Sequence, residues 1–309
     1  MSEFNRPRIG CTSWAFHGFE GGTNPEAAID IIGEIGFEGI ELILLAPEDI
    51  DSYWNAATLE RLKHQLQRHR LQLPQFVLFQ PVVQDLTSTD PDKRARSLDN
   101  FEAGCRIGRE LGAPIINIVA PWPREMRRPG GGYLPRYYDL PEAHSGDKFS
   151  IEMEASFDWQ ALWATYIETT RACLERAKAH DMKLSIEHHT HTMIPDAAHF
   201  LLLWNAIPDP DLGYNLDIGW TLSQREYPAV AIHKTRAHLM NLHVRDIDGL
   251  MRQFVHIGMG VMDFEAVADA LQAVGFQGFV SLEQDKPGGD MHQTGARYLD
   301  LMKDCLNGA

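Results

Sequence analysis

Short apolar runs and longer amphipathic stretches alternate strictly along this chain of 309 residues, and no other feature constrains the fold as much. Eight runs have the length and composition of buried strands, at residues 8–14, 39–45, 72–79, 114–120, 182–188, 212–217, 238–244 and 278–283. Eight stretches have helical spacing, at residues 25–35, 58–69, 93–111, 159–180, 195–204, 227–237, 264–274 and 291–305. Alternating strands and helices indicate right-handed crossovers and a parallel sheet.

Eight strand–helix units in 309 residues favour a closed barrel over an open doubly wound sheet. An open dinucleotide-binding sheet would carry a GxGxxG turn after its first strand, and the sequence has none there. Two junctions share one pattern, in which Gly36 or Gly275 stands where a left-handed helix cap is expected. We therefore expect an α/β fold, a single (β/α)8 TIM barrel formed by residues 1–309, with a long insertion after the fourth strand.

That insertion comprises residues 121–158, which are rich in Pro, Gly and Tyr and too long for an ordinary connection. It follows a strand, so it belongs to the face on which barrels build their active sites. We interpret it as a lid or binding loop, with a contact between subunits as the alternative. It contains His144, which such a lid could bring to the site as a catalytic base, although a solvent-facing loop position explains this histidine equally well.

The charge balance and the cysteines indicate which partners the protein binds and in which compartment it is found. The chain has 28 Lys and Arg residues against 43 Asp and Glu residues, a formal charge of −15 at pH 7, which repels phosphate backbones and anionic membranes. Its four cysteines are scattered without a CxxC pair, the first residues form no apolar leader, and no run approaches 18 apolar residues. We expect a cytoplasmic protein that binds neither nucleic acid nor a membrane.

Acidic or imidazole side chains end each of the last four predicted strands. They are Glu187, Asp217, His243 and Glu283, and each follows an apolar run. Because the strands of a parallel barrel end at one face, these side chains are expected to project together at its mouth. Three carboxylates there would repel one another, and a divalent cation is the simplest means of stabilising them. One such residue could merely form a hydrogen bond at the rim, but four on consecutive strands favour a metal site.

Oxygen ligands with one imidazole nitrogen favour Mn²⁺, Mg²⁺ or Co²⁺ over structural zinc, and we expect one such ion, with Mn²⁺ as the first choice. An ion that binds a carbonyl oxygen and a neighbouring hydroxyl stabilises the enediolate formed when a carboxylate removes the adjacent proton. Return of that proton gives an epimer or an isomer, whereas loss of a β-substituent makes the reaction that of a lyase.

Six segments carry a resemblance to a known superfamily: IGFEGIEL, SIEHH, LDIGW, NLHVRD, GMGVMDF and FVSLEQD. With these motifs the chain resembles the xylose-isomerase-like barrels, which include sugar phosphate isomerases and epimerases, dehydratases and endonuclease IV. The resemblance spans nearly the whole chain and implies that Glu187, Asp217, His243 and Glu283 bind one metal ion. It also implies that Glu187 and Glu283 transfer a proton next to the carbonyl of a sugar, a keto-sugar or a cyclitol, so a sugar isomerase or epimerase is expected.

Three positions depart from the pattern of the ketose epimerases in this superfamily. Trp220 stands where those enzymes have a histidine, Gly249 where they have an arginine, and Met259 within a segment that usually reads G-E-G. Some members of the superfamily cleave 3-oxo-glucosides, C-glucosides included, by β-elimination and work with a small second subunit. The resemblance therefore leaves such a lyase, with a small partner subunit, as the alternative to a homo-oligomeric epimerase.

Further side chains near the predicted mouth are candidates for binding a sugar or glycoside substrate. His189 and His191 alternate with Glu187 along the chain, and aromatic rings stack on the faces of sugars. For each candidate alone, core packing, an ion pair at the rim or a solvated loop position is an equally simple explanation. The candidates are Trp14, Trp122, His189, His191, Trp220, Arg245 and His256.

The sequence argues against two other classes of function. Resemblance to endonuclease IV would imply three zinc ions and further histidines on the third and fourth strands, but residues 72–79 and 114–120 contain none. The charge of −15 also disfavours DNA as a substrate. A non-catalytic sugar-binding barrel is the other class, and the complete set of four candidate ligands argues against it.

Overall fold

The strands form a closed parallel barrel, as predicted. The computed structural model describes residues 6–19, 24–126, 153–250, 253–284 and 290–308. Within these residues the hydrogen-bonded order of the barrel strands is β1-β10-β7-β6-β5-β4-β3-β2. Their bounds are Arg8–Thr12 (β1), Gly39–Leu44 (β2), Phe76–Leu78 (β3), Ile115–Val119 (β4), Lys183–Glu187 (β5), Leu212–Asp217 (β6), Leu239–Val244 (β7) and Phe279–Leu282 (β10). The predicted (β/α)8 fold is thereby confirmed.

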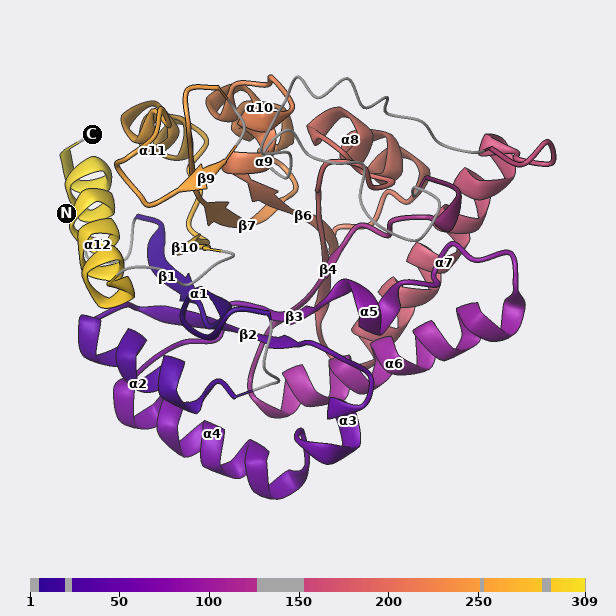
Figure 1. Ribbon diagram of the computed structural model, residues 1–309, viewed down its shortest axis with the longest axis horizontal. Coiled ribbons are helices and arrows are strands. Elements are labelled where there is room, and N and C mark those ends of the chain that lie inside the picture. The colour runs from indigo at the N-terminus through magenta and orange to yellow at the C-terminus, as the bar shows by residue number, and fades with distance from the viewer. Residues whose placement is uncertain (1–5, 20–23, 127–152, 251–252, 285–289, 309) are drawn as a thin grey trace, which may run out of the picture.

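The longer helices surround the barrel, as Figure 1 shows. They are α2 (Glu26–Ile35), α4 (Ala56–His69), α6 (Pro91–Glu110), α7 (Trp159–Ala179), α8 (Ala197–Ala206), α10 (Pro228–Thr235), α11 (Phe264–Ala273) and α12 (Met291–Gly308). The sequence patterns did not reveal the short elements α1 (Trp14–His17), α3 (Asp49–Ser52), α5 (Gln80–Val83), η1 (Arg124–Met126), α9 (Ile218–Ser223), β8 (Asp246–Ile247) and β9 (Phe254–Val255). Elements of two to six residues are too short to show a hydrophobic period.

Local chemistry explains where several helices begin and end. The side chains of Asp158 and Asp196 accept hydrogen bonds from backbone N–H groups in the first turns of α7 and α8. Gly36 ends α2 in the left-handed conformation, with φ of 97°, and Gly275 follows α11 with φ of 68°. Side chains are disfavoured at such a φ and glycine is not, so the two predicted glycine caps are confirmed.

The third strand is shorter than predicted. We expected residues 72–79, but β3 comprises only Phe76–Leu78, and Gln72 forms an isolated bridge with Gly39. Pro74 lies between these two pairings and has no N–H to donate to a neighbouring strand. Of the predicted insertion 121–158, residues 127–152 lie outside the described residues, and so does His144.

Polar side chains fill an unusual share of the barrel interior. Interiors of such barrels are filled mainly by Val, Ile and Leu. Here fully buried polar residues occur on most strands, namely Thr12, Glu41, Asn117, Ser185, Asn215, Asn241 and Ser281, with Gln75 directly before β3. Four of them stand two positions before a residue of the predicted metal site, so in a strand they point to the same side. These four residues, Ser185, Asn215, Asn241 and Ser281, form a layer beneath the barrel mouth.

Among the described residues, no helix combines the length and the apolar composition that a bilayer-spanning segment needs.

Candidate metal centre

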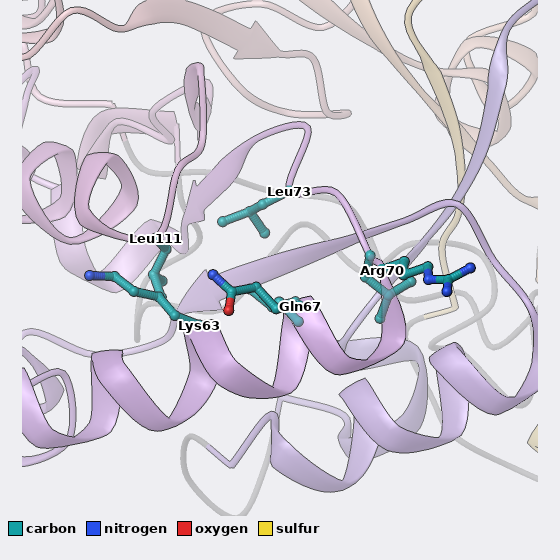
Figure 2. Close-up of a pocket in the computed structure, with 7 residues that line it drawn as sticks. Lys63, Gln67, Arg70, Leu73 and Leu111 are labelled. Carbon is teal, nitrogen blue, oxygen red and sulfur yellow. The ribbon is translucent and has the colours of Figure 1, made fainter.

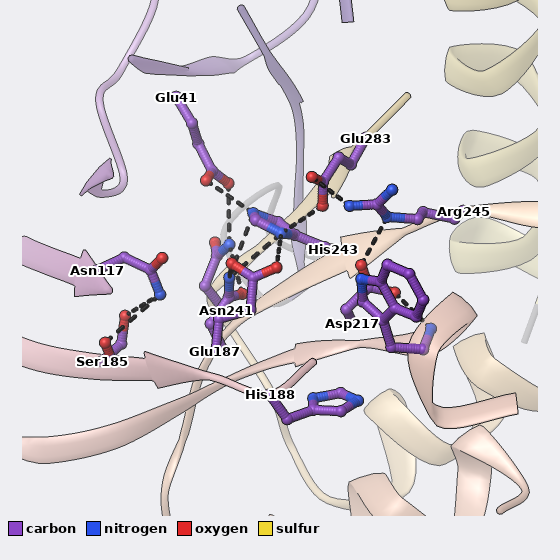
Figure 3. A network of polar contacts seen from close by, with 12 residues as sticks. Glu41, Asn117, Ser185, Glu187, His188, Asp217, Asn241, His243, Arg245 and Glu283 are labelled. Carbon is purple, nitrogen blue, oxygen red and sulfur yellow. Dashed lines mark hydrogen bonds and ion pairs between the residues drawn. The ribbon is translucent and has the colours of Figure 1, made fainter. Parts of the chain in front are cut away.

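The four residues expected to bind a metal come together in the structure. Glu187, Asp217 and His243 lie at the carboxyl ends of β5, β6 and β7, and Glu283 directly follows β10. One potential ligand atom from each lies within 4.8 Å of those of the other three. None of the four side chains is more than 4% exposed. Because β10, β7, β6 and β5 are neighbours in the barrel, closure of the sheet places these strand ends side by side (Figure 3).

Glu187 and Glu283 each have one oxygen held by a neutral hydrogen-bond donor. Glu187 Oε2 accepts from the side chain of Asn215 at 3.0 Å, and Glu283 Oε1 accepts from the indole N–H of Trp14 at 2.9 Å. The other oxygens face the imidazole, since Nδ1 of His243 lies 3.3 Å from Glu187 Oε1 and 2.7 Å from Glu283 Oε2. One imidazole nitrogen and two carboxylate oxygens therefore converge on a common point.

Asp217 serves two structural purposes at the same centre. Its Oδ1 accepts from the backbone N–H of Trp220 at 2.9 Å, which caps the N-terminus of α9. Its Oδ2 accepts from Nε of Arg245 at 2.6 Å. Each carboxylate oxygen can accept from more than one partner, so both remain able to bind a cation.

Arg245 is a buried cation between two of the carboxylates. Its side chain, which follows β7, is 4% exposed and forms ion pairs with both Asp217 and Glu283. The guanidinium carbon lies 4.7 Å from the centre of the Phe254 ring, within the range of a cation–π interaction. Arg245 thus offsets part of the negative charge that burial would otherwise make costly.

The electrostatics of the centre differ from one carboxylate to the next. Burial raises the pKa of Asp217 to about 7, although Arg245 opposes the shift. Burial likewise raises the pKa of Glu187, with His243 opposing. Burial also acts to raise the pKa of Glu283, but Arg245 and His243 outweigh it and hold that pKa below its ordinary value. Desolvated carboxylates of this kind gain from a nearby divalent cation.

The donor set fits a divalent ion. Three carboxylates and one imidazole are present, and the chemistry of mainly oxygen donors with one nitrogen suits Mn²⁺, Mg²⁺ or Co²⁺. Such ions take about six ligands, so four protein ligands leave about two positions for substrate oxygens or water. The four side chains could therefore hold one ion and still bind a small molecule.

A fourth acidic residue at this centre escaped the sequence analysis. Glu41, on β2, is fully buried, and its Oε2 lies 2.9 Å from Nε2 of His243. The available signal was a charged residue inside the apolar segment Gly39–Leu44 of a predicted strand. The position within the strand does not reveal which other strand the side chain meets.

The aromatic candidates for substrate binding are buried in the structure. Trp14, Trp122 and Trp220 are between 1% and 5% exposed. The ring centres of Trp220 and His189 lie 3.9 Å apart, so these two candidates pack against each other. Trp14 reaches the metal centre through its bond to Glu283.

The remaining histidine candidates lie on loops or near α12. The expectation that His189 and His191 continue the alternation of the strand is wrong, because β5 ends at Glu187. In the connection that follows, His191 adopts a positive φ of 71°. Nδ1 of His256 lies 3.1 Å from the hydroxyl of Thr294 on α12.

A pocket lies at the end of the barrel opposite to the candidate metal centre. This pocket of about 310 Å³ is formed by α4 and the segments that lead into β3 and β4 (Figure 2). Its lining residues are Lys63, Leu66, Gln67, Arg70, Leu71, Leu73 and Leu111. The lining contains no carboxylate or imidazole, and active sites of such barrels lie at the carboxyl ends of the strands. The candidate site is therefore the centre around His243.

The chain is similar to known proteins over nearly its whole length. A family model described as a xylose isomerase-like TIM barrel matches residues 29–302. Among solved structures, a D-allulose 3-epimerase from Methylomonas sp. has a TM-score of 0.73 and 17% identity, covering 99% of this chain and 100% of that one. An L-ribulose 3-epimerase has a TM-score of 0.75 and 18% identity, and the match covers 98% of this chain and 95% of that one. A 3-keto-D-glucoside 4-epimerase from E. coli has a TM-score of 0.73 and 18% identity, and the match covers 97% of this chain and 100% of that one.

No curated protein matches the sequence. At identities below 20%, the structural matches show a shared fold.

Proposed function

The chain belongs to the xylose isomerase-like TIM barrel family, and on this basis we propose that it is a sugar isomerase or epimerase that depends on one divalent metal ion. Its substrate is a sugar, a keto-sugar or a cyclitol, and its chemical step is removal of a proton next to a carbonyl. The observation that carries the proposal is the convergence of three carboxylates and His243 within 4.8 Å at the barrel mouth. We propose Mn²⁺ as the ion, with Mg²⁺ and Co²⁺ as alternatives.

Glu187 and Glu283 are the proposed proton-transfer groups. When bound, the ion would polarise the substrate carbonyl and offset the negative charge that develops on its oxygen. In the barrel order, β7 and β6 lie between β10 and β5, so Glu283 and Glu187 stand at the two ends of the arc of ligands. A proton that leaves toward one carboxylate and returns from the other reaches the opposite face of the carbon, which is epimerisation.

The other residues of the centre orient these two groups. Asn215 and Trp14 each hold one oxygen of Glu187 and Glu283, respectively, which leaves the second oxygen directed inward. Arg245 keeps Glu283 ionised, and the backbone of α9 together with Arg245 fixes Asp217. Such preorganisation limits the rearrangement needed during the reaction. The structural matches are epimerases of ketoses and of a keto-glucoside, which supports a sugar substrate.

A lyase that cleaves a 3-oxo-glucoside is the second candidate. By the resemblance, Trp220 stands where ketose epimerases have a histidine, and it is buried beside Arg245, whose guanidinium lies 5.6 Å from the ring centre. The chain therefore lacks one polar group that free-ketose epimerases of the superfamily use. One of the structural matches is named for a 3-keto-glucoside substrate. The same removal of a proton would then be followed by loss of the aglycone.

Proton exchange with heavy water tests the proposal. The metal-free protein is incubated in D₂O with a panel of ketoses, cyclitol ketones and 3-oxo-glucosides, each with and without Mn²⁺, and deuterium is measured by NMR and mass spectrometry. We expect Mn²⁺-dependent deuterium at the carbon next to one carbonyl. Aglycone release from the 3-oxo-glucosides would identify the lyase. Absence of metal-dependent exchange across the panel would contradict the proposed class and favour a non-catalytic barrel.

A further inference from the structure

A buried carboxylate lies directly behind the candidate metal centre. The side chain of Glu41 points from β2 into the barrel interior and has no exposed surface. Its Oε2 lies 2.9 Å from Nε2 of His243, the ring nitrogen that faces away from Glu187 and Glu283 (Figure 3). The proposed proton-transfer step makes no use of this group. A buried acid is costly to retain, so its surroundings indicate its role.

Two amide groups hold Glu41 as a hydrogen-bond acceptor. Gln75 donates from Nε2 to Oε2 of Glu41 at 2.7 Å, and Asn241 donates from Nδ2 to Oε1 at 2.9 Å. The amide of Gln75 is itself oriented, because its oxygen accepts from the hydroxyl of Ser185 at 3.1 Å. Its nitrogen must therefore face Glu41. With donors at both oxygens, the carboxylate is left to accept from the imidazole as well.

This arrangement determines which nitrogen of His243 can bind a cation. A neutral imidazole carries one N–H and one lone pair. Glu41 accepts an N–H on Nε2, so when a cation takes the place of a proton between the ring and the carboxylates, the lone pair is left on Nδ1. That nitrogen lies 2.7 Å from Glu283 Oε2 and 3.3 Å from Glu187 Oε1. The tautomer favoured by Glu41 thus presents its lone pair to the point where the candidate ligands converge.

We propose that Glu41 is a positioning residue of the metal centre, which fixes the tautomer and ring orientation of His243 and strengthens its nitrogen as a ligand. Carboxylates that accept from the free N–H of a metal-binding histidine have this effect, and their loss typically lowers metal affinity about 10- to 100-fold. The inference rests on the proposed metal dependence. It assigns a role to a residue that lies on the far side of the imidazole from the converging ligand atoms.

The first test measures binding of Mn²⁺ without substrate, by titration calorimetry, on folded protein freed of metal. Glu41→Leu removes the acceptor, and we expect its Kd to rise about 10- to 100-fold. Glu41→Gln retains one oxygen acceptor, and a rise of less than about tenfold is expected. Glu34→Gln is the matched control, because Glu34 is exposed at the end of α2, and its Kd should equal that of the wild type.

The second test needs no variant of Glu41. The wild-type protein is labelled with ¹⁵N-histidine, loaded with diamagnetic Mg²⁺, and examined by long-range ¹H–¹⁵N correlation, with the signal of His243 assigned from the His243→Gln spectrum. We expect the proton on Nε2. A proton on Nδ1 would overturn the inference, and so would an Nε2 proton without the downfield shift of an imidazole N–H that donates to a carboxylate. This readout does not depend on the folding of Glu41→Leu.

The outcomes separate the inference from the proposed function. If the wild type binds Mn²⁺ and Glu41→Leu binds it within twofold of the wild-type Kd, Glu41 has no positioning role, although the metal-dependent function stands. If the wild type binds no divalent ion, both the function and the inference fall.

Discussion

Arg245 donates from Nε to Oδ2 of Asp217 across 2.6 Å, and this pair links the seventh strand of the chain to the sixth. The first oxygen of Asp217 is taken by the backbone of α9, so the carboxylate is held from two sides. Arg245 also pairs with Glu283, so one buried cation restrains two of the three acidic ligands. The stability of the protein should therefore depend on this guanidinium.

Loss of the guanidinium should destabilise the metal-free protein. Arg245→Met leaves Asp217 and Glu283 buried without their cation, and breaking a buried pair in this way costs about 3–5 kcal/mol. We expect that decrease in the free energy of unfolding, measured by urea denaturation in the presence of a chelator. Arg236→Met, at an exposed position, is the control and should change the value by less than about 0.5 kcal/mol. A similarly small effect at Arg245 would show that the pair contributes little.

Addition of Mn²⁺ should stabilise the protein, and more so at high pH. An ion that binds only the folded state adds about 2.7 kcal/mol to the free energy of unfolding when its free concentration is 100 times its Kd. Burial raises the pKa of Asp217 to about 7, so protons compete with the ion at lower pH. We expect a larger increment in the free energy of unfolding at pH 8 than at pH 6, for the same total Mn²⁺. Equal increments would contradict a role for Asp217, and Asp217→Ala should remove the increment.

Both proposed proton-transfer carboxylates should be essential for turnover. Glu187→Gln and Glu283→Gln each replace an acidic ligand by an amide, and loss of general acid–base catalysis alone costs about 100-fold or more. We expect kcat to fall at least that far at saturating Mn²⁺, in the exchange assay or in the assay for the identified substrate. The control is Glu34→Gln, which makes the same chemical change at an exposed position. A variant of either glutamate with kcat within tenfold of the wild type would exclude that residue from the chemical step.

A buried histidine outside the ligand set should make the fold sensitive to acid. Burial lowers the pKa of His188 to about 3, and its Nε2 lies 3.2 Å from the hydroxyl of Thr221. Below pH 6.5 the unfolded chain binds a proton at this residue and the folded chain does not, so stability is lost as the pH falls from 6.5 toward 3. At pH 5 the loss amounts to about 2 kcal/mol relative to pH 7.5.

The difference between wild type and His188→Gln isolates this effect. Both proteins are unfolded with urea at pH 7.5 and pH 5 in the presence of a chelator. The wild type should lose about 2 kcal/mol more than the variant on acidification, because glutamine takes up no proton. Parallel losses in the two proteins would mean that His188 is protonated in the folded state as readily as in the unfolded chain.

Most of the fold could be predicted because the signals are local. Strand and helix periods appear within windows of a few residues, and the caps at Gly36 and Gly275 depend on their immediate neighbours. The errors have local causes as well. Pro74 makes β3 begin later than the apolar run of residues 72–79 suggests, and α9 contains only six residues after its cap at Asp217.

For the candidate site, the pattern of the sequence alone determined which residues stand at the ends of the last four strands, because the ends of apolar runs can be seen locally and parallel strands end at one face. The tertiary structure decided what those residues touch. Glu41 meets His243 from 202 residues away, and Arg245 pairs with Asp217 and Glu283 while the adjacent Asp246 binds backbone N–H groups. Alternation along a strand fixes the side toward which a residue points, but only closure of the barrel brings particular strands opposite one another.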